Sequence, residues 1–189
     1  MSKIRPKIQL ARTLLFLLLV AILGPGCKSQ NVNEAKTPKV VSVPTLELTS
    51  GLLEPGVGIK EIKLGQSRAD AEKAFGPPSE EDQNEYSKGQ TYLLFHSKGV
   101  ELRLQDDKID MITVFAKQDK WTAYPGGTSE GVGVASNAAD INQALGSPEE
   151  QAPRSLQYRK KGIMFSLDQN REGDGSNAKA QHVSIIAPR

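Results

Sequence analysis

The chain has 189 residues, with 24 Lys or Arg and 22 Asp or Glu, so its formal net charge is +2 at pH 7. Its single cysteine, Cys27, excludes an intramolecular disulfide and a cysteine-based metal site. No Lys/Arg block is interleaved with aromatic residues, so we expect no nucleic-acid partner.

The N-terminal 26 residues have the order of a bacterial export signal. Basic residues come first. A hydrophobic run follows at residues 13–23, in which only the first residue, a threonine, is polar, and Gly24-Pro25-Gly26 comes next. Because a membrane-spanning helix needs about 20 apolar residues, we predict that residues 1–26 are a cleaved signal peptide. Cleavage removes four of the 24 basic residues and no acidic one, which leaves 20 basic and 22 acidic residues and a net charge of −2.

Cys27 follows this signal directly and resembles the lipobox cysteine of bacterial lipoproteins. The resemblance implies a diacylglycerol on the Cys27 sulfur and a fatty acyl chain such as palmitate on the new amino terminus. Two or more acyl chains, at about 0.8 kcal/mol per buried methylene, hold a protein on a membrane surface. Lys28 stands where the enterobacterial inner-membrane retention signal has aspartate, so the resemblance implies an outer-membrane location facing the periplasm. Plain secretion after cleavage at the same bond and an unprocessed cytosolic cysteine are the alternatives.

Residues 27–50 are predicted to be a flexible tether. The segment is polar, contains Pro38 and Pro44, and has no helical period. A flexible chain of this length has a root-mean-square reach of roughly 25 Å. Alternating apolar residues at 39–48 leave a short edge strand as the alternative.

The remaining chain contains an internal repeat. Three pairs of segments correspond: residues 62–78 with 132–148, 95–104 with 158–167, and 112–114 with 183–185. We therefore assign repeat 1 to residues 51–120 and repeat 2 to residues 121–189.

Each repeat is predicted to begin with one short helix. Ser67 and Asn137 are typical N-cap residues, each followed three positions later by an aspartate that resembles a capping box. Gly76 and Gly146 fit a left-handed position after the helix, with a proline following. The inward stripes are predicted to be Ala71, Ala74 and Phe75 in the first helix and Ile141, Ala144 and Leu145 in the second.

The second part of each repeat is strand-like. Val100, Leu102 and Leu104 alternate with Glu101 and Arg103, which predicts a strand with one buried face. The expected fold class is α+β, with two tandem repeats, each a short helix followed by an antiparallel meander of about three strands. The two repeats are expected to pack together, as one continuous sheet or as two faces of one core.

The repeat pattern resembles two known groups of proteins. Gly65-Gln66-Ser67 through Phe75-Gly76-Pro77, and the equivalent residues 135–148, resemble the SmpA/OmlA family of lipoproteins, which attach to the outer-membrane β-barrel assembly machine. The tandem helix-plus-sheet order also looks like the secreted β-lactamase inhibitory protein. These resemblances imply the fold, whereas a fold alone does not assign function.

No residue pattern indicates catalysis, a cofactor or a metal. His96 and His182 lack the spacing of a metal pair, and no serine lies in a Gly-x-Ser-x-Gly elbow. The segment 169–180 partly imitates a calcium loop but has Lys179 where the bidentate glutamate belongs, so we expect a solvated hairpin loop. Glu80-Glu81-Asp82 is read as a solvated charge run in a loop. We predict that the chain is not an enzyme.

Trp121 and Tyr124 lie between the repeats and are the candidate partner-binding residues. Amphipathic aromatic residues often anchor recognition surfaces, and they also seal seams between packed units. The predicted function is a membrane-anchored cell-envelope lipoprotein that acts as a non-enzymatic protein-interaction or scaffolding module with an envelope protein partner. The alternative is a peptidoglycan or envelope-glycan binding module that uses the same aromatic residues.

Overall fold

The computed structural model describes residues 48–50, 52–84, 87–168 and 175–189. All of them belong to one compact unit, Ser42–Arg189. The predicted signal peptide, Cys27, most of the predicted tether and residues 169–174 of the calcium-like loop lie outside the described residues.

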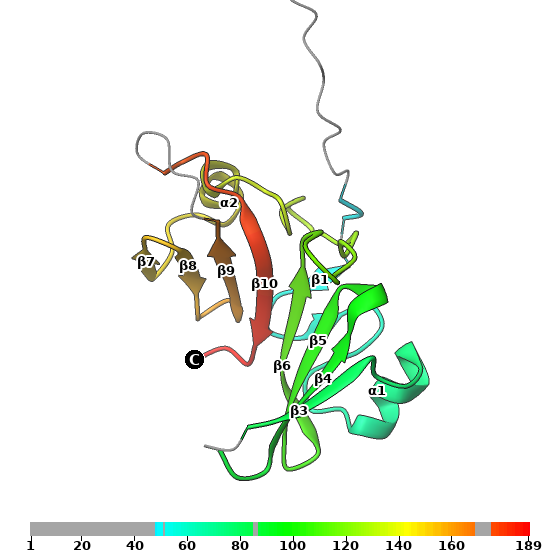
Figure 1. Cartoon of the computed structure of the whole chain (residues 1–189). Coiled ribbons are helices and arrows are strands. Elements are labelled where there is room, and N and C mark those ends of the chain that lie inside the picture. The colour runs from blue at the N-terminus through cyan, green and yellow to red at the C-terminus, as the bar shows by residue number, and fades with distance from the viewer. Residues whose placement is uncertain (1–47, 51, 85–86, 169–174) are drawn as a thin grey trace, which may run out of the picture. The chain divides into compact units, whose positions relative to one another are not determined.

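Eight strands form one antiparallel sheet in the order β3-β4-β5-β6-β10-β9-β8-β7 (Figure 1). The strands are β3 Glu80–Gln83, β4 Gln90–Phe95, β5 Val100–Gln105, β6 Lys108–Phe115, β7 Glu150–Ala152, β8 Ser155–Tyr158, β9 Ile163–Leu167 and β10 Ala180–Ile186. A 3-10 turn, His96–Lys98, separates β4 from β5. Two further short strands, β1 Leu53–Glu54 and β2 Gly58–Ile59, form a separate two-stranded sheet. The first half of the unit supplies β3 to β6 and the second supplies β7 to β10, and β6 and β10 join them at the middle of the sheet.

The predicted fold class is wrong. The chain is mostly β, and each half contributes one short helix and four strands to a single shared sheet, whereas we predicted two repeats with about three strands each. The prediction missed the edge strands, β3 and β7, whose residues are largely exposed and show no alternation. Residues 80–82, expected in a solvated loop, begin β3, because backbone pairing with β4 holds them without any buried side chain.

The two α-helices are α1, Arg68–Phe75, and α2, Ala138–Leu145. Ser67 caps α1 in a full capping box, since its side chain accepts from the Asp70 backbone N–H and its own backbone N–H donates to the Asp70 carboxylate at 2.9 Å. The predicted box on α2 does not form, because Asn137 makes no cap hydrogen bond and its side chain contacts the Asp140 carboxylate at 3.2 Å instead. Gly76 has φ 83° and ψ −167°, so its φ is positive as expected but the residue lies outside the left-handed helical region.

The helices and the β1–β2 pair contribute to one core on a single face of the sheet. The predicted stripe residues Ala71, Ile141 and Leu145 are buried, and Phe75 and Ala144 pack against the core at partial burial. The predicted burial of Ala74 is wrong, because this side chain is exposed. Leu102, Ile112, Phe165 and Val183 are fully buried and come from both halves of the sheet.

Different contacts hold the two helices on the sheet. Tyr158 of β8 is fully buried, and its hydroxyl lies 2.8 Å from Asn142 Oδ1 and 3.0 Å from the Gly146 carbonyl oxygen at the end of α2. Burial raises the pKa of Tyr158 to about 12. The equivalent aromatic residue in the first half is Phe95, which packs on Phe75 of α1 with ring centroids 5.1 Å apart. The second half therefore secures its helix with a buried hydroxyl and the first half with an aromatic contact.

The chain enters the described unit beside the segment that joins its halves. The Thr49 N–H donates to the Pro125 carbonyl at 2.7 Å, and the Gly127 N–H donates to the Thr49 carbonyl at 2.8 Å. Leu48 packs against the core. The last residues assigned to the tether at 27–50 are thus bonded to the body.

The unequal caps give a matched comparison of stability. We expect Ser67→Ala to lower the free energy of unfolding by about 1 kcal/mol, because it removes the hydrogen-bonded cap of α1. Asn137→Ala should lower it by clearly less, because no cap bond is lost. Urea unfolding followed by circular dichroism measures both, and equal losses would contradict the assigned caps.

Candidate functional site

No helix of the described residues packs on one face of the eight-stranded sheet, and we call this the open face. Strand register places one row of side chains across this face on all eight strands. The row consists of Glu80, Leu94, Glu101, Thr113, Ser184, Met164, Gln157 and Glu150. Because alternate residues of a strand point to opposite faces, these side chains lie opposite the buried core residues. The open face is therefore a continuous surface shared by both halves.

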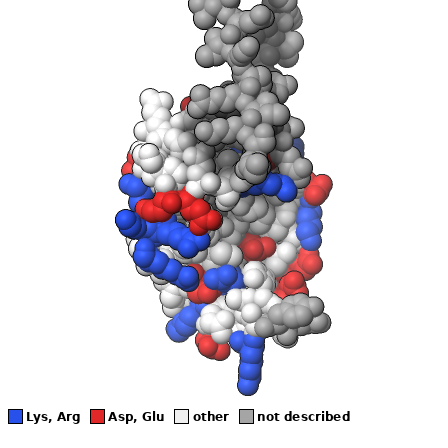
Figure 2. Space-filling model, turned by 90° about the vertical axis from the view of Figure 1, so that its left-hand side faces the viewer, with Lys and Arg blue, Asp and Glu red and all other residues white. Residues whose placement is uncertain are grey.

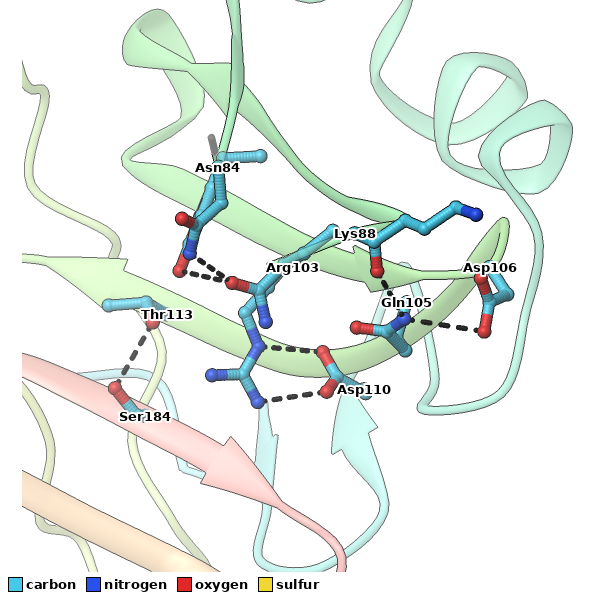
Figure 3. Close-up of polar contacts among 10 residues, drawn as sticks. Asn84, Lys88, Arg103, Gln105, Asp106, Asp110, Thr113 and Ser184 are labelled. Atoms are coloured by element: carbon cyan, nitrogen blue, oxygen red, sulfur yellow. Dashed lines mark hydrogen bonds and ion pairs between the residues drawn. The ribbon is translucent and has the colours of Figure 1, made fainter. Parts of the chain in front are cut away.

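The middle of this row is a pair of buried hydroxyls. Thr113 of β6 and Ser184 of β10 lie 3.1 Å apart, oxygen to oxygen, and form a hydrogen bond across the seam between the halves (Figure 3). Thr113 is 4% exposed and Ser184 9% exposed. The two hydroxyls at the centre of the open face are thus buried and paired with each other.

Most charges on the open face are paired. Arg103 of β5 makes a bidentate ion pair with Asp110, with nitrogen–oxygen distances of 2.8 and 2.9 Å (Figure 3). At one edge of the sheet Lys120 pairs with Glu80. At the other edge Arg159 lies 3.1 Å from Glu150. Figure 2, which looks from the β7 side of Figure 1, shows a group of Lys and Arg side chains with Asp and Glu side chains among them.

Glu101 is different from these paired charges. It lies on β5 between Leu94 and Thr113, and its carboxylate makes no ion pair or hydrogen bond with a described residue. Burial raises the pKa of the Glu101 carboxyl above its usual 4.5, and the nearby Asp82 carboxylate raises it further. Asp82 likewise has no ion pair within the described ranges. The open face therefore carries two unpaired carboxylates, Glu101 next to the central strand β6 and Asp82 on the edge strand β3.

Trp121 belongs to the edge of this open face. A turn closed by hydrogen bonds between Gln118 and Trp121 places the indole on Phe115 of β6, with ring centroids 4.0 Å apart and planes 10° apart. His96 meets the same indole edge-on at 4.6 Å, and Phe115 also contacts His182 of β10 at 5.5 Å. Trp121 thus extends an aromatic cluster that crosses from the first half to the second.

Tyr124, the other predicted partner-binding residue, lies elsewhere. It is 4% exposed, and its hydroxyl donates to Glu61 Oε2 at 3.0 Å. Its side chain lines a cleft of about 400 Å³ beside α1, together with Phe75 and Lys98. The structure therefore does not bring Trp121 and Tyr124 together on one surface.

The segment around Tyr124 docks closely on the turn between β4 and β5. Gly99 has φ 67° there, and a Cβ at this position would overlap the Thr122 carbonyl oxygen. The Tyr124 N–H donates to the Phe115 carbonyl at 3.0 Å. Glycine at this turn is what permits the close approach.

The histidines lie apart from the cleft. His96 Nε2 is 3.7 Å from Glu80 Oε2, and burial lowers the pKa of His182 below its usual 6.5. Among the described residues no group of three His, Cys, Asp or Glu is arranged to hold a metal ion. In the same part of the chain no helix has the length and apolar character needed to span a membrane.

The sequence interpretation missed Glu101, Phe115, Thr113 and Ser184 as features of the site. Each occupies a strand position that alternation assigns to the solvent side. The missing information was that β6 and β10 lie side by side, which shields positions that a single strand would expose.

Comparison with known proteins assigns no family to the chain. No protein-family model matches it, and no curated protein matches it. The uncharacterised protein yfeY from Escherichia coli is similar in structure at 12% identity, over 74% of this chain and 99% of that chain, with a TM-score of 0.49. A cysteine-rich secretory protein from Staphylococcus aureus matches at 12% identity over 74% of this chain and 50% of that chain, with a TM-score of 0.43. An extracellular SCP-domain protein from Bacillus anthracis matches at 12% identity over 66% of this chain and 44% of that chain, with a TM-score of 0.39.

At TM-scores below 0.5 these similarities carry no argument about family or activity. The resemblances to SmpA/OmlA lipoproteins and to the β-lactamase inhibitory protein remain predictions from the sequence.

The lowered pKa of His182 gives the stability a pH dependence. Above pH 6.5 the imidazole is neutral in both the folded and the unfolded chain, so it contributes no pH dependence. As pH falls below 6.5 the unfolded chain binds a proton first, so stability is lost as the pH approaches the lower, folded pKa. We expect His182→Gln to lose less free energy of unfolding than the wild type between pH 7 and pH 5, by urea unfolding at each pH. An NMR titration midpoint of His182 at or above 6.5 would contradict the assignment.

Proposed function

We propose that the chain is a lipid-anchored lipoprotein of the cell envelope and that its Ser42–Arg189 unit is a non-enzymatic protein-interaction module. The contact surface in this proposal is the open face, together with Trp121 at its edge. The observation that carries the proposal is the continuous helix-free face, which both halves of the sheet build jointly.

The composition of the open face suits a protein partner. Leu94, Met111 and Met164 provide half-buried apolar contacts between paired charges, and Trp121 adds an amphipathic aromatic ring. Recognition surfaces commonly combine apolar and aromatic groups at the centre with a polar rim. Tyr124 has no part in this surface, because its side chain is buried beside α1.

The edges of the sheet are less suited to binding than its face. β3 reads Glu-Glu-Asp-Gln and β7 reads Glu-Gln-Ala, so both edges are short and acidic. Short, charged edge strands discourage the addition of another strand. A partner is therefore expected on the face of the sheet rather than along its edges.

The anchor in the proposal rests on the sequence around Cys27. A lone cysteine directly after an export signal is consumed by acylation, which explains its presence in an otherwise cysteine-free chain. The outer membrane, with the unit facing the periplasm, is the proposed location.

Labelling with an alkyne-bearing palmitate tests the anchor. We expect the wild-type chain to incorporate the label and to fractionate with membranes, and Cys27→Ser to do neither, because the serine cannot receive the thioether-linked diacylglycerol. Equal incorporation in both chains would overturn the lipoprotein assignment.

Photo-crosslinking in the native host tests the contact surface. A benzoylphenylalanine at Met164, on the open face, is expected to form a discrete adduct with an envelope protein. The same probe at Gln143, exposed on α2, serves as the control and is expected to form none. Absence of a protein adduct at Met164, with binding of the chain to purified cell wall, would favour the glycan-binding alternative instead.

A further inference from the structure

Among the described residues, most charged side chains of the open face form ion pairs within the chain, and two carboxylates do not. Pairing within the chain neutralises Glu80 and Glu150 at the two ends of the row and Arg103 on β5. Glu101 and Asp82 have no such partner among the described residues. The open face thus presents unpaired negative charge on β3 and β5, with Glu101 next to the seam strand β6.

Glu101 is held in surroundings that disfavour an isolated charge. Leu94 and Thr113 are its cross-strand neighbours, and burial together with Asp82 raises the pKa of its carboxyl. A partly buried carboxylate without a hydrogen-bonding or ionic partner costs folding free energy. An arriving cation would offset that cost, and the desolvated position would strengthen the attraction.

We propose that the open face binds its partner protein through a lysine or arginine side chain of that partner, which forms an ion pair with Glu101 beside Asp82. This inference rests on the proposed function and names the chemistry that the partner must present.

Two other occupants fit the surface less well. A metal ion has only the two carboxylates there, and the described residues contain no group of three potential ligands. A second copy of the chain, packed with the same face, would offer these carboxylates Arg103, Lys120 and Arg159, which are already paired within the chain. A lysine or arginine on an otherwise apolar protein surface would pair with the Glu101 carboxylate and contact its apolar neighbour Leu94.

The test uses the full chain in its native host, with the crosslinker at Met164. Adduct yield is compared for the unsubstituted Glu101, Glu101→Gln and Glu101→Lys. Glu149→Gln is the matched control, because Glu149 is exposed, belongs to the loop before β7 and also has no ion pair among the described residues. We expect the yield to fall about tenfold or more in Glu101→Gln, to vanish in Glu101→Lys and to stay unchanged in Glu149→Gln.

Folding is measured in parallel. Urea unfolding should show Glu101→Gln at least as stable as the wild type, because a desolvated charge is removed, so a lower yield is not explained by unfolding. The contacted partner residue is located by mass spectrometry of the adduct. Substituting that lysine or arginine of the partner by glutamate should restore its binding to the Glu101→Lys chain.

The outcomes separate the two proposals. No protein adduct from Met164 in the wild type would overturn both the proposed function and this inference. An adduct whose yield is the same with Glu101→Gln, or whose contact lacks a lysine or arginine, would overturn only the role of Glu101.

Discussion

The pairing of β6 with β10 is the interaction on which the rest of the structure depends. It runs from His182 opposite Phe115 to Ile186 opposite Met111. A helix of eight residues and four short strands bury too little apolar surface to be stable alone. The β6–β10 ladder joins the two sets of strands into one sheet and brings their apolar faces into one core. The same ladder creates the open face, since it sets the two outer surfaces edge to edge.

The ladder also explains where polar and aromatic groups gather. Thr113 and Ser184 meet across it and satisfy each other in a place where either alone would be a buried, unpaired hydroxyl. Phe115 and His182 meet across it two register pairs away, and Trp121 stacks on Phe115. The centre of the molecule is therefore also the centre of the candidate surface, so disruption of the seam would alter both stability and recognition.

The sequence predicted the local elements of this fold better than their assembly. Ser67 and the glycine after each helix are local signals, and they located both helices correctly. The cap at Asn137 failed because its side chain turns to Asp140, an outcome that the residue types alone do not distinguish. The edge strands carry no hydrophobic period, and backbone pairing alone holds them, so no pattern of side chains could have revealed β3 or β7.

The candidate site was harder to predict because it depends on how distant strands pair. Trp121 and Tyr124 are three residues apart, yet they contribute to different surfaces. The Gln118–Trp121 turn directs the indole onto Phe115, whereas the hydrogen bond from the Tyr124 N–H to the Phe115 carbonyl carries the phenol toward α1. Glu101 reads as a solvent-facing residue in an alternating strand, and its burial follows only from its neighbours on β4 and β6.

The ion pairs on the open face reduce the side-chain entropy that binding of a partner would cost. Arg103 is held by two hydrogen bonds to Asp110, and Glu80 and Glu150 are each held by a basic side chain near opposite edges of the sheet. Long charged side chains lose rotamer freedom when a partner orders them, at roughly 0.5–1.5 kcal/mol each. Side chains that are already paired in the free protein lose less of it on binding. The face therefore combines charged side chains that are already ordered by pairing with one partly buried carboxylate, Glu101, that has no partner among the described residues.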